Sequence, residues 1–365
     1  MSVAFDRRMM ARALELAARA RGRTSPNPLV GAVITRGTRV LAEGYHKRAG
    51  SDHGEAAALR KLGWRAPGAT LYVNLEPHDH HGRTPPCTDR VIAAGITRVV
   101  VAMRDPNDMV DGRGLRKLRG AGIRVELGLM KDEAVTLNRA WITFITQRRP
   151  WVILKGALTL DGWLAAGSGD SRWVTGEAAR ADVHALRNRV DAILVGAATV
   201  RADNPALTTR GIKGGRDAVR IILDGHLTTS PRAKVFREGD SPVLVLTSEG
   251  APVIRRAALE QAGAHIEVVG QNPRIDIHAA LKRLHTRGIV TLLVEGGGAV
   301  NQSFLEAHAI DELRLYHAPK LLGGEGVPLF RGPGPRRMGA ALELRVEQRT
   351  LLGGDMMTIA IPEWS

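Results

Sequence analysis

The segment that most constrains this chain covers residues 74–89 and reads NLEPHDHHGRTPPCTD. It contains three of the twelve histidines, three of the eighteen prolines and the only cysteine. An apolar run at residues 70–75 precedes it, and a helix-like run at residues 88–94 follows it. The segment is therefore predicted to connect a strand to a helix, with imidazole and thiol side chains close to the N-terminus of that helix.

A second short motif, His53-Gly54-Glu55, opens another helix-like run at residues 56–62. Zinc deaminases combine one ligand beside a catalytic glutamate with two further ligands from a later loop that contains proline. Three protein ligands leave the fourth position on zinc open to water, whose pKa then falls towards neutrality. His53 is therefore predicted to bind zinc, and Glu55 to carry the proton from the water to the departing amino group.

The loop at residues 74–89 supplies the other two predicted ligands. Cys87 is one of them, because a helix N-terminus lowers the pKa of a thiol and favours the thiolate. His78 is the other by its position, where the common signature has cysteine, and His80 and His81 are alternatives. Imidazole is a good zinc ligand, and replacing an anionic thiolate by it should make the bound water more acidic. A domain that keeps the deaminase shape but has lost catalysis is the alternative interpretation.

Length and composition indicate the broad class of protein. A chain of 365 residues exceeds the ~250–300 residues of a usual single core, so two domains are expected. Its 44% hydrophobic and 24% charged residues are ordinary for a globular protein. A single cysteine excludes an intrachain disulfide and fits a reducing cytoplasm. Since no apolar run reaches the ~18 residues needed to span a membrane, a cytoplasmic location without a membrane partner is predicted.

The formal charge of +15 is compatible with two kinds of ligand. Nucleic acid is one, and phosphorylated small molecules are the other. The arginines are scattered along the chain and aromatic residues make up only 4%, so the interleaved basic and aromatic residues of a single-strand groove are missing. We therefore predict a phosphorylated small-molecule substrate and no nucleic-acid partner, with a nucleic-acid deaminase as the minor alternative.

Helix-like and strand-like runs alternate along the chain, which predicts α/β domains, the first with three layers. Asp6 is the predicted cap of the first helix. The polar break Gln147-Arg148-Arg149-Pro150 is the best boundary and predicts domains at residues 1–148 and 149–365. The strands predicted for the first domain are 29–34, 39–44, 70–75, 98–103 and 124–127. Those predicted for the second are 151–156, 192–196, 219–224, 243–247, 266–269, 290–295, 312–316 and 356–361.

Two turns of small residues at strand ends are prominent in the second domain. One is residues 294–298, VEGGG, before a helix-like run at 300–307, and the other is residues 196–200, GAATV. Glycines there let backbone N–H groups approach a phosphate at the positive end of a helix. The order is not the Rossmann fingerprint, because no Gly-x-Gly-x-x-Gly opens a first βαβ unit. The residues alone predict a phosphorylated ligand or a dinucleotide at these turns.

These motifs together match one family pattern over nearly the whole chain. On the deaminase side the matching segments are 26–31, 44–46 and 76–87, and the insert HHGRTPPC at 80–87 is one that pyrimidine and tRNA deaminases lack. On the reductase side the matching segments are 160–162, 171–175, 196–200, 203–210, 294–298 and 318–324. The chain resembles the bifunctional riboflavin-biosynthesis deaminase–reductases.

The resemblance implies an N-terminal cytidine-deaminase-like three-layer α/β/α domain and a C-terminal α/β domain similar to dihydrofolate reductase. With Zn²⁺, the first would remove the amino group at C2 of 2,5-diamino-6-(5-phosphoribosylamino)pyrimidin-4(3H)-one. The second would reduce the ribosyl group to a ribityl chain with NADPH. A homo-oligomer is also expected. The alternative within the family is a reductase whose degenerate deaminase domain is kept for structure.

The site residues of the family carry over to this chain position by position. Glu55 is the implied proton donor, and the implied zinc ligands are His53, His78 and Cys87. The implied cofactor positions are Ala157, Trp173, Thr199, Asp203, Gly297 and Gly298. The implied substrate positions are Asn27 in the first site and Ser171, Arg187, Leu207, Arg210 and Glu295 in the second. This chain departs from the family at His78 and at Gly54, where alanine is usual and glycine costs ~1 kcal/mol of helix propensity.

Overall fold

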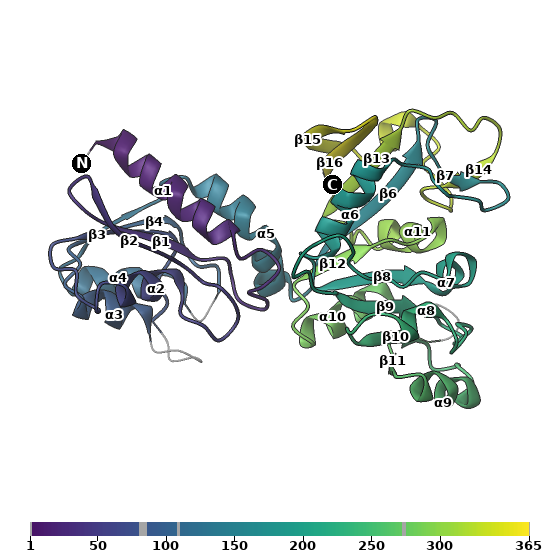
Figure 1. Ribbon diagram of the computed structural model, residues 1–365, viewed down its shortest axis with the longest axis horizontal. Helices are drawn as coiled ribbons and strands as arrows, with labels where there is room; N and C mark the ends of the chain where they lie inside the picture. The colour runs from purple at the N-terminus through teal and green to yellow at the C-terminus, as the bar shows by residue number, and fades with distance from the viewer. Residues whose placement is uncertain (1, 80–85, 108–109, 272–274, 365) are drawn as a thin grey trace. The chain divides into compact units, whose positions relative to one another are not determined.

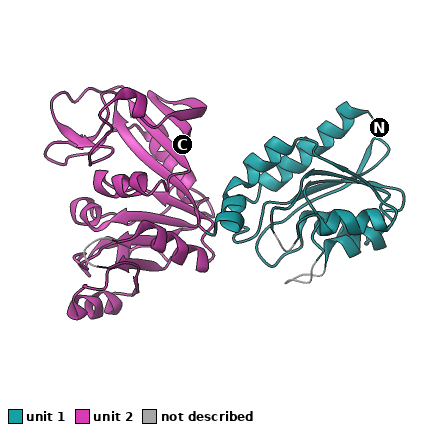
Figure 2. Ribbon diagram, turned by 180° about the vertical axis from the view of Figure 1, so that it is seen from behind, with its two compact units in different colours: residues 1–148 teal, residues 149–365 magenta. Residues whose placement is uncertain are grey.

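The computed structural model describes residues 2–79, 86–107, 110–271 and 275–364. The chain forms two compact units, Met1–Arg148 and Arg149–Ser365, which Figure 2 colours separately. Each unit contains its own β-sheet with helices packed on its faces (Figure 1). No helix within the described ranges is long and apolar enough to cross a membrane.

A five-stranded sheet forms the centre of the first unit. In spatial order its strands are β2 (Arg39–Tyr45), β1 (Gly31–Arg36), β3 (Thr70–Leu75), β4 (Arg98–Met103) and β5 (Arg124–Leu127). Its helices are α1 (Val3–Ala18), α2 (Gly54–Arg60), α3 (Cys87–Ala93), α4 (Arg113–Gly120) and α5 (Lys131–Gln147). The hairpin partner β2 and β3 both pair antiparallel with β1, whereas β3, β4 and β5 run parallel. Because α1 and α5 cover one face and α2, α3 and α4 the other (Figure 1), the predicted three-layer arrangement is confirmed.

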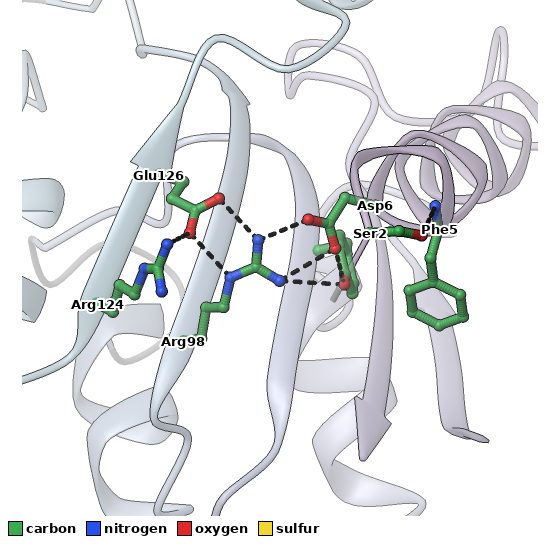
Figure 3. Close-up of polar contacts among 7 residues, drawn as sticks. Ser2, Phe5, Asp6, Arg98, Arg124 and Glu126 are labelled. Carbon is green, nitrogen blue, oxygen red and sulfur yellow. Dashed lines mark hydrogen bonds and ion pairs between the residues drawn. The ribbon is translucent and has the colours of Figure 1, made fainter. Parts of the chain in front are cut away.

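The prediction that Asp6 caps α1 is wrong. The Ser2 hydroxyl oxygen accepts the Phe5 N–H at 3.3 Å, and Asp6 lies inside the helix, in its first turn. The buried Asp6 carboxylate instead accepts hydrogen bonds from Arg98 at 2.7 and 3.0 Å (Figure 3). This contact with Arg98 holds the pKa of Asp6 below its usual value. Arg98 also donates to Glu126 at 2.7 Å, so one guanidinium joins α1, β4 and β5.

A nine-stranded sheet forms the centre of the second unit. In spatial order its strands are β11 (Ala264–Val268), β10 (Val243–Thr247), β9 (Val219–Leu223), β8 (Ala192–Gly196), β12 (Thr291–Val294), β6 (Trp151–Thr159), β13 (Glu312–Ala318), β16 (Asp355–Pro362) and β15 (Leu344–Leu352). Its helices are α6 (Glu177–Arg187), α7 (Ala197–Asp203), α8 (Lys234–Arg237), α9 (Val253–Gln261), α10 (Ile277–Thr286) and α11 (Gly298–Glu306), with a 3-10 turn at Met338–Ala340. A separate antiparallel pair joins β7 (Trp163–Ala166) to β14 (Gly326–Pro328).

The strands from β11 to β13 run parallel, and β16 and β15 add an antiparallel edge. Successive residues of β12, Leu292 and Leu293, belong to separate buried clusters, so both faces of the central sheet are covered. The parallel strands place their carboxyl ends at one edge, where ligands bind in open α/β sheets. There β8 ends at Gly196 and β12 at Val294, so both predicted small-residue turns lie at the same edge.

Several elements differ from the sequence prediction. The turn predicted at residues 196–200 is wrong beyond its first residue, because helix α7 starts at Ala197 directly after the strand. Alanine is the best helix former, and the side chain of Val200 is buried beneath this short helix. Three strands had no counterpart in the prediction: β7, β14 and β15. Most of them are short or exposed, so they carry weak apolar periodicity.

Candidate functional site

Two histidines and the only cysteine of the chain meet in the first unit. His53 precedes α2, Cys87 is the first residue of α3, and His78 lies on the connection that follows β3. Their ligand atoms all lie within 4.8 Å of one another. Cys87 Sγ is 3.7 Å from His53 Nδ1 and 3.3 Å from His78 Nε2. Tetrahedral zinc with ordinary bond lengths holds its sulfur and nitrogen ligands about 3.6 Å apart, so this donor set fits the metal.

The thiol of Cys87 is 1% exposed. Burial raises its pKa well above the usual value, and the nearby Glu55 carboxylate adds to this increase. The predicted lowering of this pKa by the helix N-terminus is therefore wrong, because loss of hydration outweighs the partial charge at the start of a short helix. A divalent cation on the sulfur reverses that balance, since a coordinating thiol is deprotonated outright. The alternative ligands His80 and His81 lie outside the described residues.

Glu55 lies in the first turn of α2 and is 1% exposed. Burial raises the pKa of its carboxyl group. Its Oε2 atom has no hydrogen-bond partner in the described part of the chain, although buried polar atoms in proteins nearly always have one. Glu55 borders a cavity of about 310 Å³ that His53 and His78 also line. The oxygen is thus available to exchange a proton with a molecule in the cavity.

Asn27 lines the same cavity and is oriented by a histidine. Its Nδ2 atom lies 3.2 Å from His46 Nε2, and His46 Nδ1 lies 3.1 Å from the Asp52 carbonyl oxygen. Because a carbonyl oxygen can only accept, His46 donates through Nδ1 and accepts the Asn27 amide N–H at Nε2. The Oδ1 atom of Asn27 is left as an acceptor for a ligand.

Two buried carboxylates at this cavity were missed by the sequence reasoning. Glu76 accepts backbone N–H groups from Asp105 and Gly112 at 3.2 and 3.1 Å. Burial, with a contribution from the charge of Glu76, raises the pKa of Asp105 to about 7. Both acids follow the parallel strands β3 and β4 at the same edge of the sheet, which was the available signal. The cavity therefore presents several hydrogen-bond acceptors.

The glycine at position 54, where the resemblance implies alanine, has a packing reason. A Cβ at Gly54 would lie 2.9 Å from the Val30 carbonyl oxygen and 3.0 Å from the Gly31 Cα. Backbone atoms cannot move aside as a flexible side chain does. The start of α2 thus lies against the start of β1 more closely than an alanine would allow, and this close approach offsets the lower helix propensity of glycine.

The second unit contains a larger cavity, of about 610 Å³. It lies at the edge where β8 and β12 end and where α7 and α11 begin. Every residue that the resemblance implied for the reductase borders this cavity. These residues are Ala157, Ser171, Trp173, Arg187, Thr199, Asp203, Leu207, Arg210, Glu295, Gly297 and Gly298.

Glu295 is the central charge of this cavity. It accepts hydrogen bonds from Arg187 at 2.8 and 2.9 Å, and the Lys155 Nζ lies 3.9 Å away. Burial acts to raise the pKa of Glu295, but Arg187 and Lys155 together lower it to about 2. Lys155, which the sequence reasoning did not single out, is a cation inside an otherwise apolar strand, and that position was the available signal.

The last two glycines of the turn before α11 have different surroundings. A Cβ at Gly298 would lie 2.7 Å from the Pro328 carbonyl oxygen, so this glycine allows a close chain crossing. At Gly297 the nearest atom would be Thr199 Oγ1 at 3.6 Å, an ordinary contact across the cavity. No side chain caps α11. Its first N–H groups are therefore available to an anionic ligand, which fits a phosphate-bearing cofactor.

Trp173 and Asp203 lie at the rim of the cavity. Trp173 is 62% exposed, so it is not a core residue, and Arg180 covers its ring at 4.7 Å. Asp203 ends α7, and burial raises its pKa. Its carbonyl oxygen accepts a hydrogen bond from Arg172 at 3.2 Å. A flat exposed ring beside a small-residue helix start is suited to stacking against a planar ligand.

Comparison with known proteins covers both units. Residues 150–358 match the family described as RibD C-terminal domain, and residues 3–103 match the cytidine and deoxycytidylate deaminase zinc-binding region. The riboflavin biosynthesis protein RibD of Bacillus amyloliquefaciens is 42% identical over 96% of this chain and 95% of its own length. The protein of that name from Escherichia coli K12 is 38% identical over 96% of this chain and 98% of its own length.

Solved structures are similar over the same extent. A diaminohydroxyphosphoribosylaminopyrimidine deaminase/5-amino-6-(5-phosphoribosylamino)uracil reductase from Thermotoga maritima matches with a TM-score of 0.87 at 38% identity, covering 99% of both chains. RibD of Acinetobacter baumannii matches with a TM-score of 0.90 at 35% identity, covering 100% of both. The chain therefore belongs to the RibD family, the bifunctional riboflavin-biosynthesis enzymes that combine a zinc-dependent deaminase with an NADPH-dependent reductase.

Proposed function

We propose that residues 1–148 are the deaminase domain, with His53, His78 and Cys87 as the zinc ligands and Glu55 as the acid–base catalyst. The observation that carries this proposal is the close approach of three ligand atoms beside a buried carboxylate oxygen that has no partner in the described chain. When bound, zinc supplies Lewis acidity that makes water a nucleophile at neutral pH. A histidine in place of the usual cysteine leaves the ligand set with one anion, which is chemically sufficient for zinc.

The proton transfers of deamination are assigned to Glu55. It accepts a proton from water as the water oxygen bonds to C2 of the diaminopyrimidinone, and it delivers a proton to the amino nitrogen as the C–N bond breaks. Ammonia leaves, the remaining hydroxyl proton moves to a ring nitrogen, and a carbonyl replaces the amino group. Asn27 Oδ1 accepts an N–H of the base, because its amide nitrogen is engaged by His46. Acceptors in the cavity suit this substrate, whose amino groups are hydrogen-bond donors.

Residues 149–365 are then the reductase domain, which converts the ribosyl group to a ribityl chain. NADPH supplies the hydride. Ala157, Trp173, Thr199, Asp203 and the Gly297–Gly298 turn position the cofactor. Ser171, Leu207, Arg210 and the ion pair of Arg187 with Glu295 position the substrate, whose 5′-phosphate needs a cation.

The partner of the chain is its phosphorylated pyrimidine substrate, and no nucleic acid is assigned. We also assign a homo-oligomer. The edge strand β15 supports this assignment, because Leu344 and Val346 on it are 40% and 44% exposed and its outer backbone edge has no neighbour in the sheet order of the described chain. Exposed apolar edge strands favour pairing with another chain.

The test is to measure zinc content and both activities in the full-length protein. One zinc per chain, release of ammonia from the diaminopyrimidinone substrate and NADPH oxidation with the deaminated product are expected. The variant His78→Ala should lose zinc and deamination while NADPH oxidation is retained, since the two cavities belong to separate units. Protein purified without chelator that contains no zinc and releases no ammonia, but still oxidises NADPH, would refute the deaminase assignment and leave a reductase alone.

A further inference from the structure

The cavity of the second unit contains more cationic than anionic side chains. Five cations and two carboxylates border it. The cations are Lys155, Arg180, Arg187, Arg210 and Arg331, and the carboxylates are Asp203 and Glu295. Such a cavity attracts anionic ligands. This inference rests on the proposed function, which requires two anionic ligands in this cavity. They are a substrate with a 5′-phosphate and a dinucleotide with several phosphates.

Three of the five cations already have partners. Arg187 donates to Glu295 at 2.8 Å, and the Lys155 Nζ lies 3.9 Å from the same carboxylate. Arg180 donates to the Thr175 carbonyl oxygen at 2.7 Å. In the described part of the chain the guanidinium groups of Arg210 and Arg331 make no hydrogen bond or ion pair. Their charges are therefore available to bind the phosphate groups of the two ligands.

Arg210 lies on the side of the cavity assigned to the substrate. Its backbone N–H donates to His184 Nδ1 at 3.2 Å, and both His184 and Arg187 belong to α6. Arg187 also donates to the carbonyl oxygen of Thr208 at 3.1 Å. These contacts join the segment before Arg210 to the ion pair of Glu295.

Arg331 lies beside the start of α11, next to the turn assigned to the cofactor. Its backbone N–H donates to the Gly298 carbonyl oxygen at 3.0 Å. A Cβ at Gly298 would lie 3.0 Å from the Arg331 Cβ, so the glycine is what allows this segment to cross the helix start. One turn further, the Asn301 side chain donates to the Leu329 carbonyl oxygen at 2.9 Å. The backbone of Arg331 is thus fixed beside the uncapped N–H groups of α11, and this exposed residue lines the cavity.

We propose that Arg331 binds a phosphate of NADPH and so increases the affinity of the reductase for its cofactor. A guanidinium and the first N–H groups of a helix present several donors to one phosphate, and charged hydrogen bonds of this kind are stronger than neutral ones. Both the pyrophosphate and the 2′-phosphate of the cofactor offer this chemistry. Arg331 is not among the cofactor positions that the resemblance implied.

The experiment measures cofactor binding directly, by titrating the full-length protein with NADPH and with NADH and following tryptophan fluorescence. Arg331→Gln is expected to raise the Kd for NADPH by about tenfold, which corresponds to the loss of one charged hydrogen-bonding group. Arg331→Lys should recover part of this loss. Arg336→Gln is the matched control, because it removes the same charge from an exposed arginine of the same segment that does not border the cavity. Its Kd should stay within about twofold of wild type.

NADH separates the two phosphate sources. If Arg331→Gln weakens NADPH and leaves NADH unchanged, the contact is with the 2′-phosphate, and if both weaken equally it is with the pyrophosphate. An unchanged Kd for NADPH in Arg331→Gln would overturn the proposal. It would also be overturned if this variant bound ribose 5-phosphate more weakly than wild type while its affinity for NADPH stayed the same. Wild-type protein that binds no NADPH would refute the proposed reductase function instead, so the two failures are distinguishable.

Discussion

The two cavities hold their buried charges in different ways. In the first unit, the buried Glu55 has an oxygen without a hydrogen-bond partner in the described chain, and burial raises the pKa of both Glu55 and Cys87. In the second unit, burial acts on Glu295 in the same direction, but Arg187 and Lys155 lower its pKa to about 2. The second cavity therefore balances its acid with protein cations, whereas among the described residues of the first unit the lowering effect of Arg90 is smaller than the effect of burial.

The difference shows what each site needs before it can act. A divalent cation completes the donor set of two histidines and a cysteine, which lies beside a carboxylate whose Oε2 has no partner in the described chain. The first site therefore depends on a metal for its ionisation state. In the second site Glu295 and Arg187 are already charged in the folded protein, so the site needs only its substrate and cofactor. Variants that change one charge in each cavity test this contrast.

The largest effect is expected from Glu55→Gln. The amide cannot exchange protons, so deamination should fall by about 10²–10⁴-fold while zinc stays bound, because Glu55 is not assigned as a ligand. Ammonia release and metal content are measured on the same preparation. Glu43→Gln, a carboxylate on β2 paired with Arg12, is the control and should keep full activity. If zinc is lost in parallel with activity, Glu55 is a zinc ligand. The described contrast between a metal-dependent first cavity and a second cavity balanced by protein cations would then be wrong for Glu55.

Arg187→Met tests how protein cations stabilise the buried Glu295 in the second cavity. It leaves the buried Glu295 with Lys155 alone, at 3.9 Å. Breaking a buried ion pair in this way is expected to lower the unfolding free energy of residues 149–365 by about 3–5 kcal/mol. Denaturant titration monitored on the reductase unit gives this value. Arg189→Met makes the same exchange two residues away, at an exposed position, and should have little effect. Equal losses in both variants would show that the ion pair contributes nothing particular.

The smallest effect is expected from Asp105→Asn, and it depends on pH. The pKa of Asp105 is about 7 in the folded protein and 3.8 in its reference state, so the folded state binds the proton more tightly. Wild-type stability should therefore fall as pH rises from about 4 to 7, and the amide removes this loss. Asp105→Asn is expected to be more stable than wild type by about 2–4 kcal/mol at pH 8 and no more stable at pH 4. Denaturation midpoints at the two pH values measure the difference. A constant difference would mean that the Asp105 carboxyl is not perturbed.

Local sequence patterns were sufficient for most of the fold. The strands Thr70–Leu75, Ala192–Gly196 and Val243–Thr247 have the bounds that their apolar runs predicted. Each is buried along its whole length and consists mostly of apolar residues, as expected of strands that are covered on both faces. The identity of the zinc-ligand candidates also follows from spacing, because His53 and Cys87 each stand at the start of a helix.

Long-range contacts decided the rest. The residues around Asp6 predicted a helix cap. Arg98, which is distant in the sequence, instead donates a hydrogen bond to the Asp6 carboxylate. The pKa of Cys87 depends on burial and on Glu55, which a local helix argument cannot include. Arg331 is one scattered arginine in the sequence, and only the crossing of its segment over Gly298 brings it to the cavity. Sequence patterns report the environment of a residue among its neighbours, whereas charge and pKa depend on which groups the tertiary fold brings within a few ångströms.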